Sequence, residues 1–255
     1  MSAAWDELFD EVRAWRRAGA EVGFWWRDDD ACRATPELTR LLTLAQDSGA
    51  PLALAVIPQA AEAAAFSPWP FTVAVLQHGV THVNRAASTQ KKSEFPESEP
   101  VQEGMNRLLQ GREQLRQIFG ERALPVLAPP WNRFPKSWVA ELAAHGYRGL
   151  STFLPRGRAS PATGLIQVNT HVDIVDWRHG KKFIGEEQAL SLACEQLRLR
   201  RRGAADHTEP VGWLTHHAVH EEAAWRFLAE LLQRTKELPG LRWLHPREVF
   251  GLPVA

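Results

Sequence analysis

Cysteine is scarce in this sequence: only Cys32 and Cys194 occur among 255 residues. Two cysteines are no disulfide framework, so the fold has to rest on a hydrophobic core. Apolar residues make up 44% of the chain, which is enough for a substantial core and argues against a disordered protein. Such sparse cysteine usage also fits a reducing compartment.

Long apolar runs are missing as well. No stretch approaches the ~20 apolar residues that a membrane-spanning helix needs. Residues 1–22 carry early acidic side chains and no continuous apolar segment, unlike a signal peptide. We therefore expect a cytoplasmic protein without a membrane partner.

An excess of either charge is absent too, because 30 Lys and Arg residues balance 30 Asp and Glu residues. This balance argues against a nucleic-acid partner. The basic run at 197–202 is expected to be the solvated end of a helix, where cations oppose the helix dipole. No G-x-G-x-x-G or G-x-x-x-x-G-K-[ST] motif is present, so nucleotide binding has no local support.

Short apolar runs alternate with helical patterns through most of the chain. This alternation predicts a mostly parallel sheet with helices outside it. About seven strands suit an incomplete β/α barrel formed by a single domain over 1–255, with an N-terminal helix within 1–20; an open doubly wound sheet is the main alternative. The expected strands are 22–26, 51–57, 71–77, 124–128, 147–154, 164–169, 211–215 and 241–244. The expected helices are 5–18, 35–50, 60–66, 101–120, 135–146, 185–203 and 221–238.

Five polar clusters follow separate predicted strands. In a parallel barrel the carboxyl ends of all strands share one face, which holds the active site. We therefore expect these distant clusters to converge. They are RDDD (27–30), QHGVTH (77–82), APPWNRF (128–134), HVDIVDW (171–177) and THH (215–217).

His78 and His82 stand four residues apart, a spacing that suits a metal when both lie on one helical turn. A carboxylate from RDDD would complete three protein ligands and leave a position open for water, as in catalytic metal sites. Three adjacent carboxylates also repel each other unless a cation is near. The alternative is that these acids cap the helix that begins near Thr35, or stay solvated.

Taken together, RDDD, HGVTH, APPWN, DIVDW and WLTHH resemble, in order and rough spacing, the five motifs of polysaccharide deacetylases, carbohydrate esterase family 4. The resemblance runs from about residue 22 to residue 217. It implies a distorted β/α barrel and the hydrolysis of N-acetyl groups on amino sugars with one divalent metal, often zinc.

The resemblance also implies roles for the acids and the first two histidines. Asp29 would be the catalytic base, and Asp30 would bind the metal together with His78 and His82. The additional Asp28 leaves the pair Asp28 and Asp29 as an alternative register. Under the preferred register, Asp28 takes part neither in metal binding nor in catalysis.

The last motif places the general acid of the resembled family at His216, with His217 as the alternative. Asp173 or Asp176 would hold this histidine in the tautomer that donates a proton. His216 and His220 form a second H-x-x-x-H, which leaves a competing metal site open, although the following EEAAW looks like a helix start.

Substrate contacts are expected from the third and fourth motifs. Two tryptophans of these motifs would line the pocket. The loop that contains QKKSEF (90–95) is interpreted either as a lid or as a mobile linker. His171 and His179 are expected in solvated loops. The residues expected to contact the substrate are Pro130, Trp131, Asn132, Trp177 and His217.

One departure from the motifs matters for activity. The resembled family usually has an arginine before the proline pair, where it braces the base, and this chain has Ala128 there. Arg27 is favoured over Arg133 as the replacement because it adjoins the acids. The departure suggests a divergent branch whose substrate is a saccharide or another acylated amine. A catalytically lapsed protein that binds such a ligand without turnover is the alternative.

Overall fold

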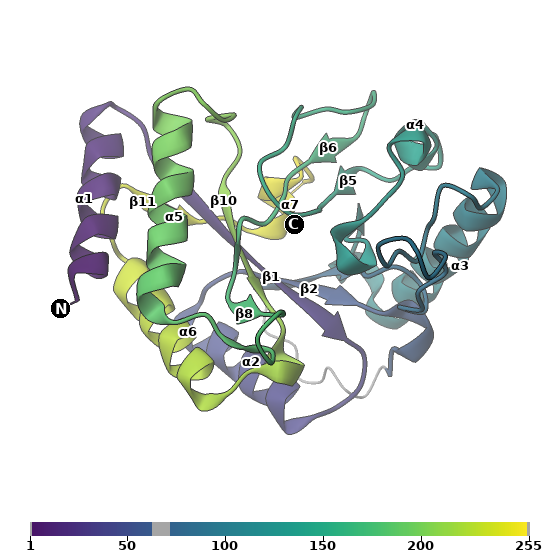
Figure 1. Ribbon diagram of the computed structural model, residues 1–255, viewed down its shortest axis with the longest axis horizontal. Coiled ribbons are helices and arrows are strands. Elements are labelled where there is room, and N and C mark those ends of the chain that lie inside the picture. The colour runs from purple at the N-terminus through teal and green to yellow at the C-terminus, as the bar shows by residue number, and fades with distance from the viewer. Residues whose placement is uncertain (1, 63–71, 254–255) are drawn as a thin grey trace.

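One parallel sheet runs through the computed structural model, which describes residues 2–62 and 72–253 (Figure 1). The sheet curls, and helices cover its outside. Its strands are β1 (Val22–Ala31), β2 (Leu52–Val56), β3 (Val73–Gln77), β4 (Ala123–Leu127), β5 (Gly149–Leu150), β6 (Ile166–Gln167), β7 (Val172–Asp173), β10 (Val211–Thr215) and β11 (Leu241–Trp243). An antiparallel hairpin of β8 (Val175–Asp176) and β9 (Lys182–Phe183) stands apart from this sheet.

The order of the strands is that of an incomplete barrel. Neighbouring strands follow the order β6-β5-β4-β3-β2-β1-β10-β7, and β11 pairs with the first residues of β1. The path ends at β6 on one side and β7 on the other, so within the described residues the sheet forms a half-barrel. The expected α/β fold with a distorted, mostly parallel barrel is confirmed.

The helices lie close to the expected positions. The N-cap of the second helix is Thr35, whose hydroxyl accepts the N–H of Leu38 at 3.1 Å, and Gly49 ends it at φ 68°. The helix expected over 60–66 lies largely outside the described residues. No helix in the described ranges is long and apolar enough to cross a membrane. The helices are α1 (Ala3–Arg17), α2 (Pro36–Ser48), α3 (Val101–Phe119), α4 (Val139–Ala144), α5 (Glu186–Arg201), α6 (Glu222–Thr235) and α7 (Pro246–Val249).

Strand β1 pairs with three other strands, β2, β10 and β11. Its residues Phe24, Trp25 and Trp26 are completely buried, and alternate side chains enter two different hydrophobic clusters. The indole N–H of Trp26 donates to the hydroxyl of Thr215 at 2.8 Å, so β1 and β10 are also joined by a side-chain hydrogen bond. Complete burial of a large apolar side chain contributes roughly 1.5–3 kcal/mol, which makes this strand a firm support for polar groups at its end.

Two polar residues expected in solvent are buried instead. His171 and Arg200 are each 2% exposed, and they meet Glu209 beneath α5. Arg200 Nη2 lies 3.3 Å from Glu209 Oε2, and Arg200 Nε donates to the Glu209 carbonyl oxygen at 2.8 Å. The segment 197–202 ends α5 as expected, and its last two residues are exposed. The expectation of solvent exposure is corrected for Arg200 and for His171. These residues join α5 to the chain that leads into β10.

Candidate active site

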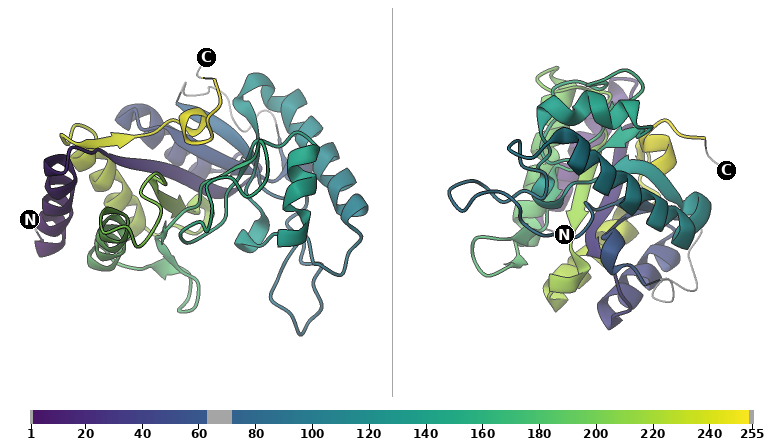
Figure 2. Two further views of the ribbon diagram at one scale, coloured as in Figure 1. Left: turned by 90° about the horizontal axis from the view of Figure 1, so that it is seen from above. Right: turned by 90° about the vertical axis from the view of Figure 1, so that its right-hand side faces the viewer.

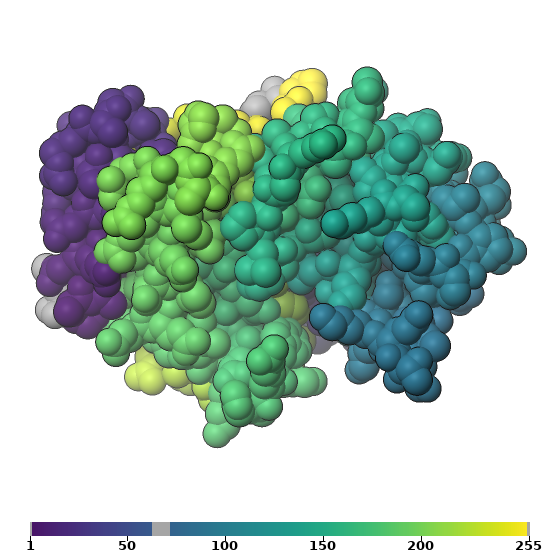
Figure 3. Space-filling view, turned by 45° about the horizontal axis from the view of Figure 1, so that its top comes forward, coloured from purple at the N-terminus to yellow at the C-terminus, as the bar shows by residue number. Residues whose placement is uncertain are grey.

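The carboxyl ends of the strands surround a cavity of about 700 Å³. The loop over 84–100 and the β8–β9 hairpin project from the same side of the molecule (Figure 2). The surface is hollowed between the green hairpin and the teal-blue segments (Figure 3). All five polar clusters reach this cavity, which confirms their expected convergence. Their lining residues are Asp29, Asp30, His78, His82, Trp131, Asn132, Arg133, Asp173, Asp176, Trp177 and His216.

The end of β1 turns so that two neighbouring acids face the same cavity. Side chains alternate along a strand, so Arg27 and Asp29 share one face and Asp28 points to the other. The pairing of β1 with β2 shifts its register between Asp28 and Ala31. At this irregularity Asp30 takes φ 70°, in the left-handed region. Asp30 therefore joins Asp29 at the cavity instead of following Asp28.

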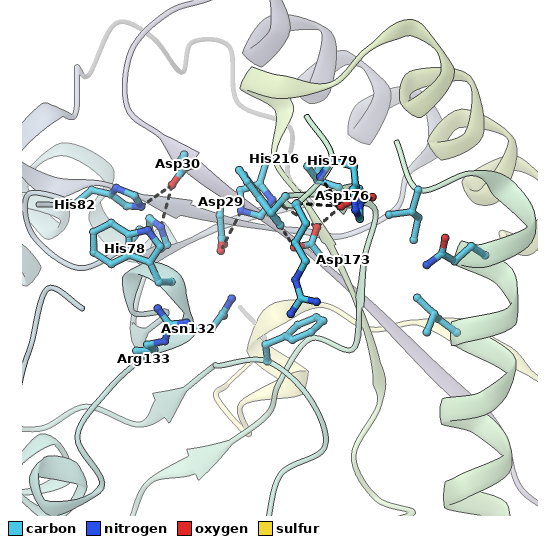
Figure 4. Close-up of a pocket in the computed structure, with 18 residues that line it drawn as sticks. Asp29, Asp30, His78, His82, Asn132, Arg133, Asp173, Asp176, His179 and His216 are labelled. Carbon is cyan, nitrogen blue, oxygen red and sulfur yellow. Dashed lines mark hydrogen bonds and ion pairs between the residues drawn. The ribbon is translucent and has the colours of Figure 1, made fainter. Parts of the chain in front are cut away.

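Asp30, His78 and His82 form the one group with metal-ligand geometry found in the described residues. Their three ligand atoms lie within 4.8 Å of one another. The Nε2 atoms of His78 and His82 are 3.0 and 3.2 Å from the same Asp30 oxygen, Oδ1 (Figure 4). The alternative register is not supported, because Asp28 takes no part in this group.

The chemistry of these three residues fits a divalent ion such as zinc. His78 Nδ1 lies 2.8 Å from the Ala128 carbonyl oxygen, so Nδ1 carries a proton and Nε2 faces Asp30. A backbone carbonyl that accepts the N–H of a metal-binding histidine typically fixes the tautomer of its ring. The buried Asp30 Oδ1 has no well-directed hydrogen bond, so its lone pairs are free to bind a cation. Two imidazoles and one carboxylate are ordinary zinc ligands.

The pKa values of Asp30 and His78 are shifted by their contact with each other. Burial alone would raise the pKa of Asp30, but the close contacts with the ring nitrogens of His78 and His82 outweigh burial and hold that pKa far below its usual range. Burial alone would lower the pKa of His78, but the charge of Asp29 and the contact with Asp30 raise it. The site therefore stabilises positive charge beside its carboxylates.

Arg27 occupies the place expected of the missing arginine. It is completely buried, and its Nε and Nη2 lie 2.9 and 3.0 Å from the two carboxylate oxygens of Asp29. The same guanidinium donates to Asn132 Oδ1 at 2.6 Å and to Ser151 Oγ at 2.7 Å. Arg133 instead donates to the carbonyl of Lys92. Arg27 is thus the arginine that braces Asp29, as favoured from the sequence.

His216 stands across the cavity from the metal-ligand group. Its Nε2 lies 3.9 Å from Asp29 Oδ2, and its Nδ1 lies 3.9 Å from Asp173 Oδ1. The Asp173 carboxylate accepts the indole N–H of Trp177 at 2.7 Å, and Trp177 packs edge-on against the His216 ring. Burial raises the pKa of Asp173. Of the two expected orienting acids, Asp173 lies beside His216, whereas Asp176 pairs with the exposed His179 at 2.7 Å.

His217 is turned away from the cavity, and its expected substrate contact is corrected. It lies 97% buried in direct contact with Asp28, whose carboxylate also accepts its backbone N–H at 3.0 Å. The second H-x-x-x-H does not act as a metal pair. His220 Nε2 accepts the backbone N–H of His216 at 3.2 Å, and burial lowers the pKa of His220 to about 4.

The other expected substrate contacts differ in position. Trp131 and Trp177 line the cavity, and the Trp131 ring lies 4.6 Å from that of His82. Asn132 lines it too, but its oxygen binds Arg27. The expected substrate contact of Pro130 is corrected, because this residue is buried against Gly79, in the turn between the two histidines. No sequence motif marks a further group of lining residues, which come from separate segments: Phe153, Val175, Arg178, Ile184, Gln188 and Leu192.

Comparison with known proteins identifies this fold. No protein family matches the sequence, and no curated protein matches it. A Mycobacterium smegmatis protein assigned by its name to the polysaccharide deacetylases superposes with a TM-score of 0.61 at 13% identity, covering 91% of this chain and 90% of that chain.

Two further solved structures agree. A family 4 carbohydrate esterase from Streptococcus mutans gives a TM-score of 0.57 at 11% identity, covering 91% of this chain and 90% of that chain. A Bacillus cereus polysaccharide deacetylase gives 0.55 at 15% identity, covering 92% and 96%. The chain has the fold of the polysaccharide deacetylases and family 4 carbohydrate esterases.

Proposed function

We propose that the protein is a metal-dependent hydrolase that removes an acyl group, the N-acetyl group foremost, from an amino sugar or a related amide. One observation carries the proposal. A metal-ligand group, an arginine-braced carboxylate and a separate histidine with a buried acid beside it face one cavity. Together these three parts can supply the Lewis acid, the general base and the general acid for hydrolysis of an amide.

Asp30, His78 and His82 would hold the ion. A divalent metal supplies Lewis acidity there, which lowers the pKa of water and polarises a carbonyl oxygen. Zinc is the ion proposed, because its usual ligands are those present.

Asp29 and His216 divide the proton transfers between them. Asp29 takes a proton from the water that attacks the carbonyl carbon, and Arg27 fixes both of its oxygens in place. His216 gives a proton to the nitrogen as the carbon–nitrogen bond breaks, so a carboxylic acid and an amine leave the site. Asp173 would orient His216, because its Oδ1 lies 3.9 Å from Nδ1 of that ring. Each such transfer contributes roughly 10²–10⁴-fold in rate.

The ligand chemistry is a saccharide or small molecule with an acylated amine. A deacetylase of the same fold has been solved with substrate, and a family 4 carbohydrate esterase from Streptomyces lividans with acetate, the product that an N-acetyl substrate would give. Trp131 and Trp177 offer aromatic faces at the cavity wall. We place the reaction in the cytoplasm.

The competing proposal, a lapsed protein that binds without turnover, rested on the missing arginine of the third motif. Arg27 makes a bidentate contact with Asp29 from within β1, so the base is braced from another position. An acid and a base with separate partners are more than binding requires. This arrangement favours an active enzyme.

Metal content and turnover of an acetylated amino sugar test the proposal. The His78→Ala, His82→Ala double variant should lose both metal and activity, because two of three ligands are gone. His216→Ala should keep stoichiometric metal and lose roughly 10²–10⁴-fold in kcat. The exposed His207 provides a matched control as His207→Ala. Full metal content in the double variant, or no turnover by wild-type protein loaded with zinc, would refute the proposal.

A further inference from the structure

A buried carboxylate from the long loop lies against the turn that carries both histidines. Glu94 is completely buried. Its oxygens accept the backbone N–H of Thr81 at 2.7 Å, that of Val80 at 3.2 Å and that of His82 at 3.3 Å. The hydroxyl of Thr81 adds a fourth donor at 2.8 Å. All four of these donors belong to the turn between the two histidines, and all four bind the Glu94 carboxylate.

The turn is shaped to admit this group. Gly79 takes φ 60°, and a Cβ there would come within 2.0 Å of Glu94 Oε2. His82 also takes a positive φ, 57°, which a residue other than glycine adopts at some cost. Three successive backbone N–H groups that point to one side form an anion-binding concavity. Glu94 supplies the anion and thereby fixes a conformation that the turn would not favour by itself.

The loop that delivers Glu94 is an anchored structure. Asn84 Oδ1 accepts the N–H of Ser93 at 2.9 Å and that of Ala86 at 3.2 Å, and the Arg85 N–H donates to the Ser93 carbonyl at 2.8 Å. These bonds close the loop immediately before Glu94. The segment 90–95 therefore contacts the histidine turn through Glu94.

We propose that Glu94 is a positioning residue for the metal site, which holds the His82 imidazole where it can share an ion with Asp30 and His78. This inference rests on the proposed metal-dependent function. His78 follows β3 directly and is fixed by the Ala128 carbonyl, whereas His82 lies five residues beyond Gln77, the last residue of the strand. The backbone of His82 is held by Glu94, so the separation of the two histidines depends on that carboxylate.

Glu94→Gln tests the proposal with almost no change of shape. All four partners of the carboxylate are donors, so the amide NH₂ of glutamine would face donors and lose their bonds. We expect zinc to bind 10- to 100-fold more weakly, about the loss seen when groups behind metal ligands are removed. Zinc titration of metal-free full-length protein against a competing chelator measures the dissociation constant. Circular dichroism reports whether the variant is folded.

A second pair of variants keeps the test decisive if Glu94→Gln does not fold. Thr81→Val removes one hydroxyl donor and should weaken zinc binding several-fold, whereas Thr81→Ser keeps the hydroxyl and should restore wild-type affinity. Glu97→Gln, an exposed acid of the same loop, is the control and should bind as the wild type does. Cobalt(II) absorption reports the ligand geometry independently of activity.

The outcomes separate this inference from the function on which it rests. Wild-type protein that binds no metal overturns the proposed function. Wild-type protein that binds zinc while folded Glu94→Gln binds it equally well overturns only the role of Glu94. If Glu94→Gln and Glu97→Gln lost zinc affinity equally, the loss would come from the net charge of the loop. That result would also overturn the positioning role of Glu94.

Discussion

At the scale of single residues, Arg27 explains how Asp29, the proposed base, is held in place without an arginine before the prolines. The sequence indicated Arg27 because it adjoins the acids, and alternation along β1 places it on the same face as Asp29. The other partners of its guanidinium, Asn132 and Ser151, could not be predicted, because both follow strands far away in the sequence. The position of Arg27 next to the acids thus predicted its contact with Asp29, whereas its contacts with Asn132 and Ser151 arise only in the folded chain.

Arg27→Lys should lower turnover without displacing the metal. A lysine offers one ammonium and cannot contact both oxygens of Asp29 while also reaching Asn132 and Ser151. A small misplacement of a catalytic group costs roughly 10²-fold, so we expect kcat to fall by about that factor. Steady-state kinetics together with zinc content checks this. If Arg133→Lys produced the same fall and Arg27→Lys none, Arg133 would be the brace.

At the scale of elements, the end of β1 and the segment after β10 form a single unit. The register pairs Asp28 with Thr215, and the Asp28 carboxylate accepts the Thr215 hydroxyl at 2.6 Å and the His217 N–H at 3.0 Å. These two contacts lie on either side of His216. The sequence placed the five clusters correctly but assigned no role to Asp28, because the direction of three successive acids depends on a local shift in register.

Asp28→Asn should therefore have an effect, contrary to the expectation from the sequence. The buried amide cannot accept from all the donors around it, and an unsatisfied buried group costs about 1–3 kcal/mol. We expect a lower free energy of unfolding, reduced kcat through a displaced His216, and an unchanged zinc affinity. Urea denaturation, kinetics and zinc titration measure the three quantities. Asp47→Asn, on the exposed side of α2, is the control, and identical behaviour of both variants would contradict this role.

Element positions followed the sequence where local signals were strong. Thr35, Pro36 and Gly49 mark the two ends of α2 by their capping chemistry. The β8–β9 hairpin and β7 were not predicted as strands, because segments of two residues carry no period. The hairpin nevertheless supplies one wall of the cavity through Val175 and Trp177. Short elements of this kind are defined by their partners in the fold rather than by their own residues.

At the scale of the whole molecule, alternation of strands and helices predicted the sheet, and convergence of strand ends predicted the cavity. The buried polar group at the opposite ends of the strands was not predicted. Basic residues at a helix end usually face solvent, and nothing local in LRLRRR distinguishes Arg200 from its neighbours. Its burial follows from Glu209 and His171, which approach from other parts of the chain.

This buried group should make the fold sensitive to acid. Burial lowers the pKa of His171 from its usual 6.5, and Arg200 lowers it further against the opposing effect of Glu209. His171 Nδ1 accepts the Gly212 N–H at 2.9 Å, so a proton on that nitrogen would break the bond. The folded chain therefore keeps His171 neutral, while the unfolded chain takes up a proton near pH 6.5. Stability is present above that pH and is lost as the pH falls below it.

The contribution of His171 amounts to about 1.4 kcal/mol for each pH unit below 6.5, until the folded state also takes up the proton. His171→Gln cannot bind a proton, so its stability should fall less steeply between pH 7 and pH 5, even though it starts lower. His220 acts in the same direction, since its pKa is also lowered, so the difference between variant and wild type isolates His171. Urea denaturation of both proteins at several pH values in this range measures the slopes. The exposed His207, changed to glutamine, is the control. Parallel curves for His171→Gln and the wild type would show that the buried group does not govern the acid response.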